Sequence, residues 1–237
     1  MKSHVSDCVP QVERLVHLLR ENQDWELEAR FGRIERGRFL PGVRRQTMDR
    51  LIKMMQSSSY FTEEEKGWTE MHDFFYRDER GRNVRTRVLF DPNRMTTVLQ
   101  TAVTEKMESY LLSHNTPSPH PMDVRVGLKT ETPVDSASSF RSHPSVSPHH
   151  VRIKQHRRFR YEGWAFDFSI TWSGSTKTEA EQRQASSDPP QYEVEVELVD
   201  REAYFQTRTD QYLASSLLLK MHDLVDSPST SSFRVAT

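Results

Sequence analysis

The stretch of residues 192–198 constrains the fold of this chain more than any other feature. It reads Tyr-Glu-Val-Glu-Val-Glu-Leu, with apolar and acidic residues in strict alternation. Successive side chains of a β-strand point to opposite faces, so Glu193, Glu195 and Glu197 share one face. Carboxylates on a common face repel one another. The face is therefore either a solvated sheet edge kept soluble by its charge, or a place where cations lie among the acids.

The rest of the strand pattern favours the second interpretation. Residues 25–32 read Trp-Glu-Leu-Glu-Ala-Arg-Phe-Gly and place Glu26 and Glu28 on one face of another strand. Between these two acidic stretches the predicted strands alternate in the same way, but their charged faces are mostly basic. Those faces carry Arg85 and Arg87, then Arg125, Lys129 and Glu131, and then Arg152, Lys154, His156 and Arg158. We expect acidic and basic faces of this kind to line a common interior.

This alternation predicts a mainly β (α+β) protein of about eight strands, with about three helices at residues 9–19, 45–55 and 201–223. The opposite strand faces are rich in aromatic and aliphatic residues, which require cover from water. We therefore predict a closed eight-stranded antiparallel β-barrel with a charged lumen, flanked by the helices. About eight strands enclose room for side chains or one small ligand. Residues 95–111 fit one long strand, or a strand followed by a short helix; we favour the strand.

The bulk composition is consistent with a charged interior. Of 237 residues, 35% are hydrophobic and 28% are charged, which is a thin supply for an ordinary apolar core. The net charge of −1 gives no general attraction to nucleic acid or membranes. The single cysteine, Cys8, excludes an intramolecular disulfide and fits a reducing compartment. No apolar run is long enough for a bilayer and no signal-peptide core is present, so we expect a soluble, intracellular protein without membrane partners.

Runs of polar residues set the predicted domain organisation. We expect an N-terminal helical segment at 1–23 that packs on the barrel, and a barrel domain at 24–226. Segments rich in Ser, Pro and His, at about 132–149, and in polar residues, at about 173–190, are predicted to be mobile insertions. Residues 227–237 are predicted to be a flexible tail.

The segregation of acids and bases onto different strands suggests a ligand. Carboxylate oxygens are hard donors of the kind that Mg²⁺ and Mn²⁺ prefer. Arginine and lysine side chains favour phosphate groups. The acids would bind a metal and the bases would bind a polyanion. The implied ligand is therefore a phosphate chain that carries a bound metal.

Two paired motifs carry a family resemblance. Residues 25–32 and 192–198 together resemble the paired glutamate motifs of the triphosphate tunnel metalloenzymes, and most closely the metal-dependent RNA 5′-triphosphatases of mRNA capping in fungi, protozoa and some viruses. The stretch from Arg152 to His156 is similar to the basic strand of that group, and Asp167 lies where the group has an aspartate on the next strand. The resemblance covers about residues 24–200, which is most of the chain.

This resemblance implies a hydrolase that acts on phosphoric anhydrides. The reaction would release the γ-phosphate from the 5′-triphosphate end of nascent RNA, the first step of cap formation. The resemblance implies Mn²⁺ or Mg²⁺ as cofactor, triphosphate-ended RNA as partner and a nuclear location. No Lys-x-Asp-Gly motif of nucleotidyl transfer occurs, so the guanylyltransferase would be a separate protein. The sequence carries no signal of oligomeric state.

The resemblance also implies roles for individual residues. Glu26, Glu28 and Glu197 would bind the metal. Glu195 would hold the attacking water and Glu193 would brace a neighbouring base. Asp167 would bind a metal-shell water and Glu131 would order the site through ion pairs. The predicted phosphate-binding residues are Arg85, Arg87, Lys106, Lys129, Arg152, Lys154, Arg157 and Arg158.

One departure from the family pattern leaves an alternative open. The basic strand of the family alternates Arg-x-Lys-x-Arg, and His156 stands at the third position here. Arg158 shares the lumen face by strand parity, whereas Arg157 would reach it only through a β-bulge. Arg85 and Arg87 are likewise both candidates for one phosphate position.

Two other functions also fit the sequence. The chain resembles tunnel enzymes with other substrates, such as a tripolyphosphatase, a thiamine triphosphatase, an NTPase or a cyclase. A polyphosphate-binding module without catalysis would use the same charged lumen. Substrate choice and the effect of Glu26→Ala and Glu197→Ala separate these possibilities.

Overall fold

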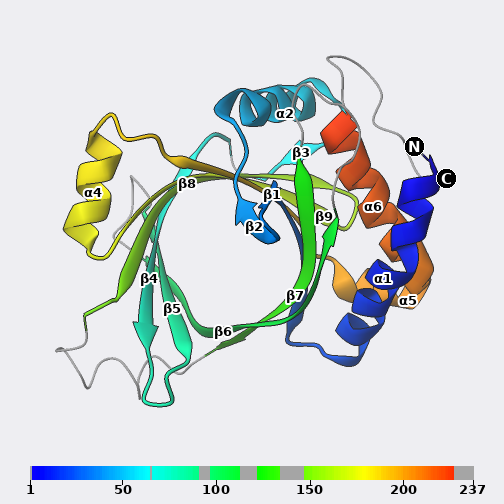
Figure 1. Ribbon diagram of the computed structural model, residues 1–237, viewed down its shortest axis with the longest axis horizontal. Coiled ribbons are helices and arrows are strands. Elements are labelled where there is room, and N and C mark those ends of the chain that lie inside the picture. Colours follow the sequence, from blue (N-terminus) through cyan, green and yellow to red (C-terminus); the bar gives the residue numbers. More distant parts are fainter. Residues whose placement is uncertain (1, 65, 91–96, 113–121, 134–146, 227–237) are drawn as a thin grey trace.

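Eight long antiparallel strands curl around a central space in the computed structural model, which describes residues 2–64, 66–90, 97–112, 122–133 and 147–226 (Figure 1). The eight strands are β1 (Trp25–Glu35), β4 (Thr69–Arg77), β5 (Asn83–Phe90), β6 (Thr97–Leu112), β7 (Asp123–Pro133), β8 (His150–Tyr161), β9 (Trp164–Gly174) and β10 (Gln191–Leu198). Two short strands lie at the margins: β2 (Arg38–Pro41) pairs with β1, and β3 (Thr62–Glu63) pairs with β8.

The strands follow the order β10-β9-β8-β4-β5-β6-β7-β1, each antiparallel to its neighbour. This confirms the mainly β class and the eight antiparallel strands. The single strand expected over 95–111 is confirmed as β6.

The sheet is strongly curled and incompletely closed, in place of the fully closed barrel that we predicted. The end strands β1 and β10 pair at three positions only, where Glu28, Ala29 and Arg30 face Glu197, Val196 and Glu195. From Gly32 onward the same edge of β1 pairs instead with β2. Because β2 takes this edge, the seam between β1 and β10 is short.

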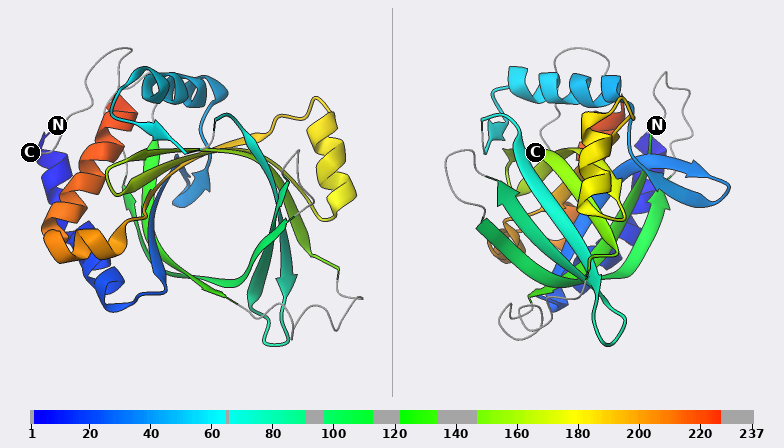
Figure 2. Two further views of the ribbon diagram at one scale, coloured as in Figure 1. Left: turned by 180° about the vertical axis from the view of Figure 1, so that it is seen from behind. Right: turned by 90° about the vertical axis from the view of Figure 1, so that its left-hand side faces the viewer.

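The apolar faces of the strands point outward, as predicted, and helices cover them (Figures 1 and 2). The covering helices are α1 (Lys2–Glu21), α2 (Arg45–Ser57) and α6 (Asp210–Asp226). Their buried leucines and methionines form one core with strand residues such as Phe166, Phe168 and Val196. Each fully buried phenylalanine contributes roughly 1.5–3 kcal/mol. Packing on the outer face thus leaves the inner face to the charged residues.

The described residues contain five helices, more than the sequence predicted. The predicted closing helix is divided into α5 (Arg201–Thr207) and α6, because the Thr209 side chain accepts a hydrogen bond from Tyr212 N at 3.1 Å and caps the start of α6. The predicted insertion at 173–190 contains α4 (Lys177–Ala185), which Thr176 caps. Ala180 of α4 is buried against Val151 and Ile153 of β8.

The N-terminal segment packs with the C-terminal helix. Val12, Val16 and Leu19 of α1 belong to the same core as Leu213 and Leu217 of α6. Most of the insertion predicted at 132–149, together with the tail at 227–237, lies outside the described residues. Within the described part of the chain, none of the helices is long and apolar enough to cross a membrane.

Candidate active site

A charged cavity of about 930 Å³ occupies the space that the strands enclose. Among the described residues, ten basic and eight acidic side chains line it, an excess of positive groups. It brings together thirteen of the predicted site residues: Glu26, Glu28, Arg85, Arg87, Lys106, Lys129, Glu131, Arg152, Lys154, Arg158, Asp167, Glu195 and Glu197. The strand alternation therefore located the cavity wall correctly.

Two predicted residues are not part of this wall. Arg157 points away from the cavity, where its Nε donates to Glu63 Oε1 at 2.6 Å and its guanidinium lies over the Phe159 ring. β8 pairs with β9 without the bulge that would have turned Arg157 into the cavity, so the structure does not bring Arg157 together with the other predicted phosphate-binding residues. Glu193 is buried and is not among the residues that line the cavity; its Oε1 accepts a hydrogen bond from Arg152 Nη2 at 2.5 Å. This contact matches the predicted bracing of a neighbouring base.

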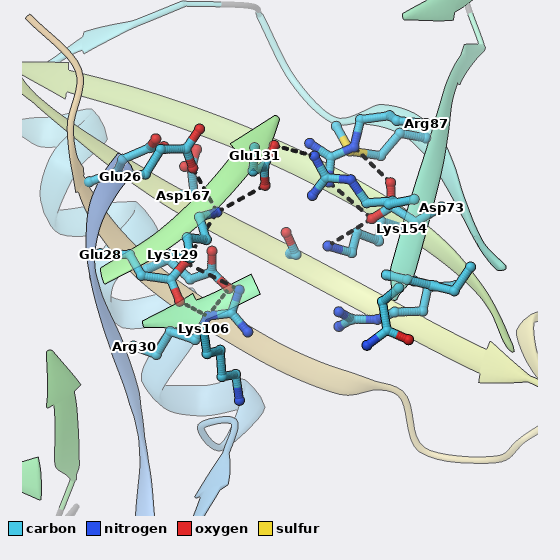
Figure 3. Close-up of a pocket in the computed structure, with 18 of the residues that line it drawn as sticks. Glu26, Glu28, Arg30, Asp73, Arg87, Lys106, Lys129, Glu131, Lys154 and Asp167 are labelled. Atoms are coloured by element: carbon cyan, nitrogen blue, oxygen red, sulfur yellow. Dashed lines mark hydrogen bonds and ion pairs between the residues drawn. The ribbon is translucent and has the colours of Figure 1, made fainter. Parts of the chain in front are cut away.

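Lys129 lies in the middle of the acidic cluster (Figure 3). Its Nζ is 2.9 Å from Glu26 Oε2, 3.3 Å from Glu28 Oε2 and 3.3 Å from Glu131 Oε1. Register explains the arrangement, since Lys129 of β7 lies directly opposite Glu26 of β1. Burial lowers the pKa of Lys129, but the surrounding carboxylates outweigh it and raise the pKa above the ordinary value.

Glu197 completes this cluster from the next strand, because it lies opposite Glu28 across the seam. Burial raises its pKa to about 7; Lys129 and Arg158 oppose the rise, while Glu26 and Asp167 add to it. Its carboxylate thus has less cationic compensation than its neighbours. The donor chemistry of Glu26, Glu28 and Glu197 fits a hard divalent cation. Among the described residues, however, no three carboxylates, cysteines or histidines converge as they would around a bound metal.

Arg30 is a cavity residue that the sequence analysis did not single out. Its Nε lies 2.9 Å from Glu28 Oε1 and 3.0 Å from Glu195 Oε1, so it links β1 to β10 (Figure 3). Burial raises the pKa of Glu195, but Arg30, Lys154 and Lys129 reverse the effect and hold this pKa below its ordinary value. Glu195 is therefore ionised at neutral pH. Arg30 has the same strand parity as Glu26 and Glu28, and this parity could have identified it as a cavity residue from the sequence.

Asp73 of β4 is the second residue that the sequence analysis missed. It is only 1% exposed and accepts two hydrogen bonds from Arg87, Nε to Oδ1 at 2.7 Å and Nη2 to Oδ2 at 2.9 Å. Lys154 Nζ lies 3.3 Å from its Oδ2. Burial opposes ionisation of Asp73, but Lys154 and Arg87 hold its pKa well below the usual range. The inward positions of β4 also include Met71 and Phe75, so alternation gave no signal.

The remaining bases are also held by acids. Arg158 donates to both oxygens of Asp167, at 2.6 and 2.7 Å, and its Nη2 donates to Glu197 at 3.2 Å. Arg158, and not Arg157, therefore takes the inward place beside His156, whose Nε2 lies 2.9 Å from Asp167. Arg85 Nη2 donates to Glu131 Oε2 at 2.5 Å. Of these residues, Glu131 and Asp167 are labelled in Figure 3.

Two lysines are less completely neutralised. Lys154 is buried in the wall, and burial lowers its pKa to about 8, with Arg152 lowering it further and Asp73 and Glu193 opposing. Lys106 lines the cavity from β6. Burial, together with Arg125 and Arg30, lowers its pKa. Both lysines would gain from an anionic ligand.

The cavity therefore consists of interlocked ion pairs, and acids and bases are less segregated than the sequence suggested. Arg30 lies within the acidic cluster, and Asp73 and Asp167 lie within the basic one. A buried ion without a partner costs several kcal/mol, so each wall includes some of the opposite charge.

Comparison with known proteins gives a consistent result for the fold. No protein-family model and no curated protein sequence matches this chain. Among solved structures, the RNA triphosphatase Pct1 of S. pombe aligns with a TM-score of 0.67 at 15% identity, over 96% of this chain and 93% of that chain. Pct1 in complex with the Spt5 CTD gives a TM-score of 0.69 at 15% identity, over 95% of each chain.

A viral protein shows the same likeness. The RNA triphosphatase domain of a trifunctional mimivirus mRNA capping enzyme aligns with a TM-score of 0.56 at 13% identity, over 92% of this chain and 97% of that chain. This chain has the fold of the RNA triphosphatases. These alignments cover 92–96% of this chain and 93–97% of the solved chains.

Proposed function

We propose that this protein is a metal-dependent polynucleotide 5′-triphosphatase that hydrolyses the γ-phosphate of triphosphate-ended nascent RNA, the first step of mRNA cap formation. The observation that carries the proposal is the enclosed cavity, where Glu26, Glu28 and Glu197 on β1 and β10 share one space with the arginines and lysines of β5, β6 and β8. The fold shared with RNA triphosphatases supports the same reaction.

Glu26, Glu28 and Glu197 would hold Mn²⁺ or Mg²⁺. The bound cation supplies Lewis-acid stabilisation of charge on a γ-phosphate oxygen.

The basic residues of the cavity have a positioning role in this proposal. Phosphoryl transfer depends mainly on positioning and charge neutralisation. Arg87 and Arg158 each form two hydrogen bonds with a buried aspartate, so their guanidinium groups are oriented before a ligand enters. Lys106 and Lys154, which have incomplete compensation, would bind phosphate oxygens together with Arg85, Lys129 and Arg152.

The acidic residues divide into water activation and support. Glu195 is ionised and faces the cavity, so it would orient the attacking water and accept its proton. Glu131, Glu193 and Asp167 hold Arg85, Arg152 and Arg158 in place. The water would attack in line, without a covalent intermediate.

A tripolyphosphatase is the second candidate function. The cavity lining is mostly charged, and among the described residues that line it the apolar side chains are those of Met71 and Phe75. Such a lining offers many contacts to a phosphate chain and few to a nucleobase or a thiamine ring. A short inorganic polyphosphate therefore fits the same wall.

The proposed partners are triphosphate-ended RNA and a separate guanylyltransferase, and the proposed location is the nucleus. One solved structure of the S. pombe RNA triphosphatase Pct1 is a complex with the Spt5 CTD, which supports partner binding by an enzyme of this fold. We propose no corresponding surface on this chain.

The decisive assay is γ-phosphate release from triphosphate-ended RNA, ATP, tripolyphosphate and thiamine triphosphate, each with Mg²⁺ and with Mn²⁺. The proposal predicts release from RNA that requires metal and is lost in Glu26→Ala and Glu197→Ala. Glu181→Ala is the matched control, because Glu181 forms an exposed pair with Lys177 on α4. Cleavage of tripolyphosphate without cleavage of RNA would replace the capping function by the second candidate.

A further inference from the structure

We propose that the ammonium group of Lys129 is an internal competitor of the divalent cation. It occupies the carboxylate cluster while the cavity is empty, and the cation must displace it in order to bind. This inference rests on the metal site in the proposed function and adds a residue that controls its occupancy.

The geometry of Lys129 supports this role. Its Nζ lies within 3.3 Å of oxygens from three different carboxylates, two of which, Glu26 and Glu28, are the proposed metal ligands. An ammonium ion at this place satisfies the same oxygens that a metal would use. Two cations at hydrogen-bond distance from a common pair of carboxylates repel each other strongly, so the cluster holds one of them at a time.

Lys129 is also the cation in the cluster that is best able to leave. Its ammonium group is carried on a flexible four-carbon stem with free rotation. Arg30, by contrast, is fixed between Glu28 on its own strand and Glu195 across the seam. The side chain of Lys129 is 20% exposed to the cavity, so it has space in which to move.

A phosphate chain is the natural destination of the displaced ammonium group. Lys129 lines the same cavity as Arg85 and Lys154, which are proposed phosphate-binding residues. Binding of the metal would release Lys129 for contact with phosphate, and phosphate would in turn draw Lys129 from the carboxylates. The two ligands would then strengthen each other's binding by the same factor. Lys129 would neutralise the carboxylates before the substrate binds, and the metal would neutralise them afterwards.

The test measures Mn²⁺ binding directly, by the electron paramagnetic resonance signal of free Mn²⁺, in the absence of substrate. Lys129→Met removes the competing charge and is expected to bind Mn²⁺ at least tenfold more tightly than the wild-type protein. Lys129→Arg keeps a cation and is expected to bind within threefold of wild type. Arg152→Met is the control for loss of a positive charge elsewhere, because Arg152 is held by Glu193, which is not a proposed ligand. It is expected to change the affinity less than threefold.

A second measurement addresses the release of Lys129. Inorganic phosphate is expected to raise the Mn²⁺ affinity of the wild-type protein and to have less effect on Lys129→Met. An equal increase in both proteins would overturn the coupling. Circular dichroism establishes that each variant is folded, and Lys129→Gln replaces Lys129→Met if the latter is not.

The outcomes separate this inference from the proposed function. Equal Mn²⁺ affinity in wild type and Lys129→Met, with binding lost in Glu26→Ala, would overturn the competition and leave the metal site intact. A tenfold gain in Arg152→Met as well would also overturn it, since the effect would then reflect the total charge of the cavity. Absence of Mn²⁺ binding in all variants, with metal-independent phosphate release, would overturn the proposed function together with the inference.

Discussion

Two walls of the cavity can be compared: an acidic wall, with Glu26 and Glu28 on β1 and Glu195 and Glu197 on β10, and a basic wall on β4, β5 and β8. Each wall pairs its charges with some of the opposite sign, but the two walls differ in how firmly those charges are held. On the basic wall, Asp73 is buried and holds Arg87 through two hydrogen bonds, and Asp167 holds Arg158 in the same way. On the acidic wall, Lys129 is shared by three carboxylates and none of them binds it in a fixed bidentate geometry.

This difference indicates what each wall is able to exchange. Planar guanidinium groups on paired carboxylates are oriented in advance, which lowers the reorganisation required when phosphate binds. An ammonium group on a flexible stem is replaceable by another cation. In the proposed function, the basic wall would therefore be a rigid receptor for phosphate, and the acidic wall would be an exchangeable cation site.

The largest expected effect is on the rigid wall. Asp73→Asn removes the buried charge that holds Arg87 and Lys154, and loss of one partner from a buried pair costs about 3–5 kcal/mol. We expect urea denaturation to show a loss of stability of this size. Glu179→Gln on α4 breaks an exposed pair with Arg183 and is expected to change the stability much less, because solvent screens exposed ion pairs. Equal losses in the two variants would show that the basic wall is not rigidified by Asp73.

The next effect is on the acidic wall and appears in catalysis. Glu197→Ala removes a proposed metal ligand, and loss of such electrostatic stabilisation lowers kcat by roughly 10²–10³-fold. Stability should fall little, because Glu197 is the carboxylate with the least compensation and its folded pKa is already raised to about 7. Steady-state phosphate release with Mn²⁺ and a thermal unfolding curve give the two values. A large loss of stability with unchanged kcat would contradict this prediction, because Glu197 would then serve stability and not catalysis.

A smaller effect distinguishes the two neighbouring arginines of β8. Arg158→Ala removes an inward guanidinium and is expected to raise the KM for tripolyphosphate roughly 10–100-fold, which corresponds to about 1.4–3 kcal/mol for a charged hydrogen bond. Arg157→Ala removes an outward one and should leave KM within about twofold, since its partner Glu63 lies outside the cavity. Initial-rate kinetics of the two variants provide the measurement, and similar KM values in both would contradict the strand register.

The smallest effect is a pH dependence of the basic wall. The pKa of Lys154 is lowered to about 8, chiefly by burial, so the free protein loses this charge as the pH rises through about 8. Phosphate binds the protonated form, and KM for tripolyphosphate should therefore rise by up to about tenfold per pH unit above this value. Lys154→Arg stays charged and should remove this break in the pH profile. An unchanged break in that variant would assign the titration to another group.

Strand alternation predicted much of the cavity wall, because a period of two fixes which residues share a face. It placed Glu26, Glu28, Lys154 and Arg158 correctly. It did not reveal Asp73, because the inward face of β4 mixes apolar Met71 and Phe75 with Asp73 and Arg77 and is not uniformly charged. The periodicity of one strand carries no information on which residue lies opposite it.

The sequence therefore did not predict which residues pair across neighbouring strands. The position of Lys129 between Glu26 and Glu28 depends on the register of β1 against β7. The short seam depends on competition between β2 and β10 for one edge of β1. The pairings of β1 with β7 and with β10 join segments far apart in the chain, and neither is encoded in a local pattern.

The most direct test of the account is γ-phosphate release from triphosphate-ended RNA by the wild-type protein and by Glu197→Ala, with and without Mn²⁺. The account predicts release by the wild-type protein only when Mn²⁺ is present, and a loss of roughly 10²-fold or more in the variant. Release that is equal in both proteins, or that proceeds unchanged without metal, would contradict it.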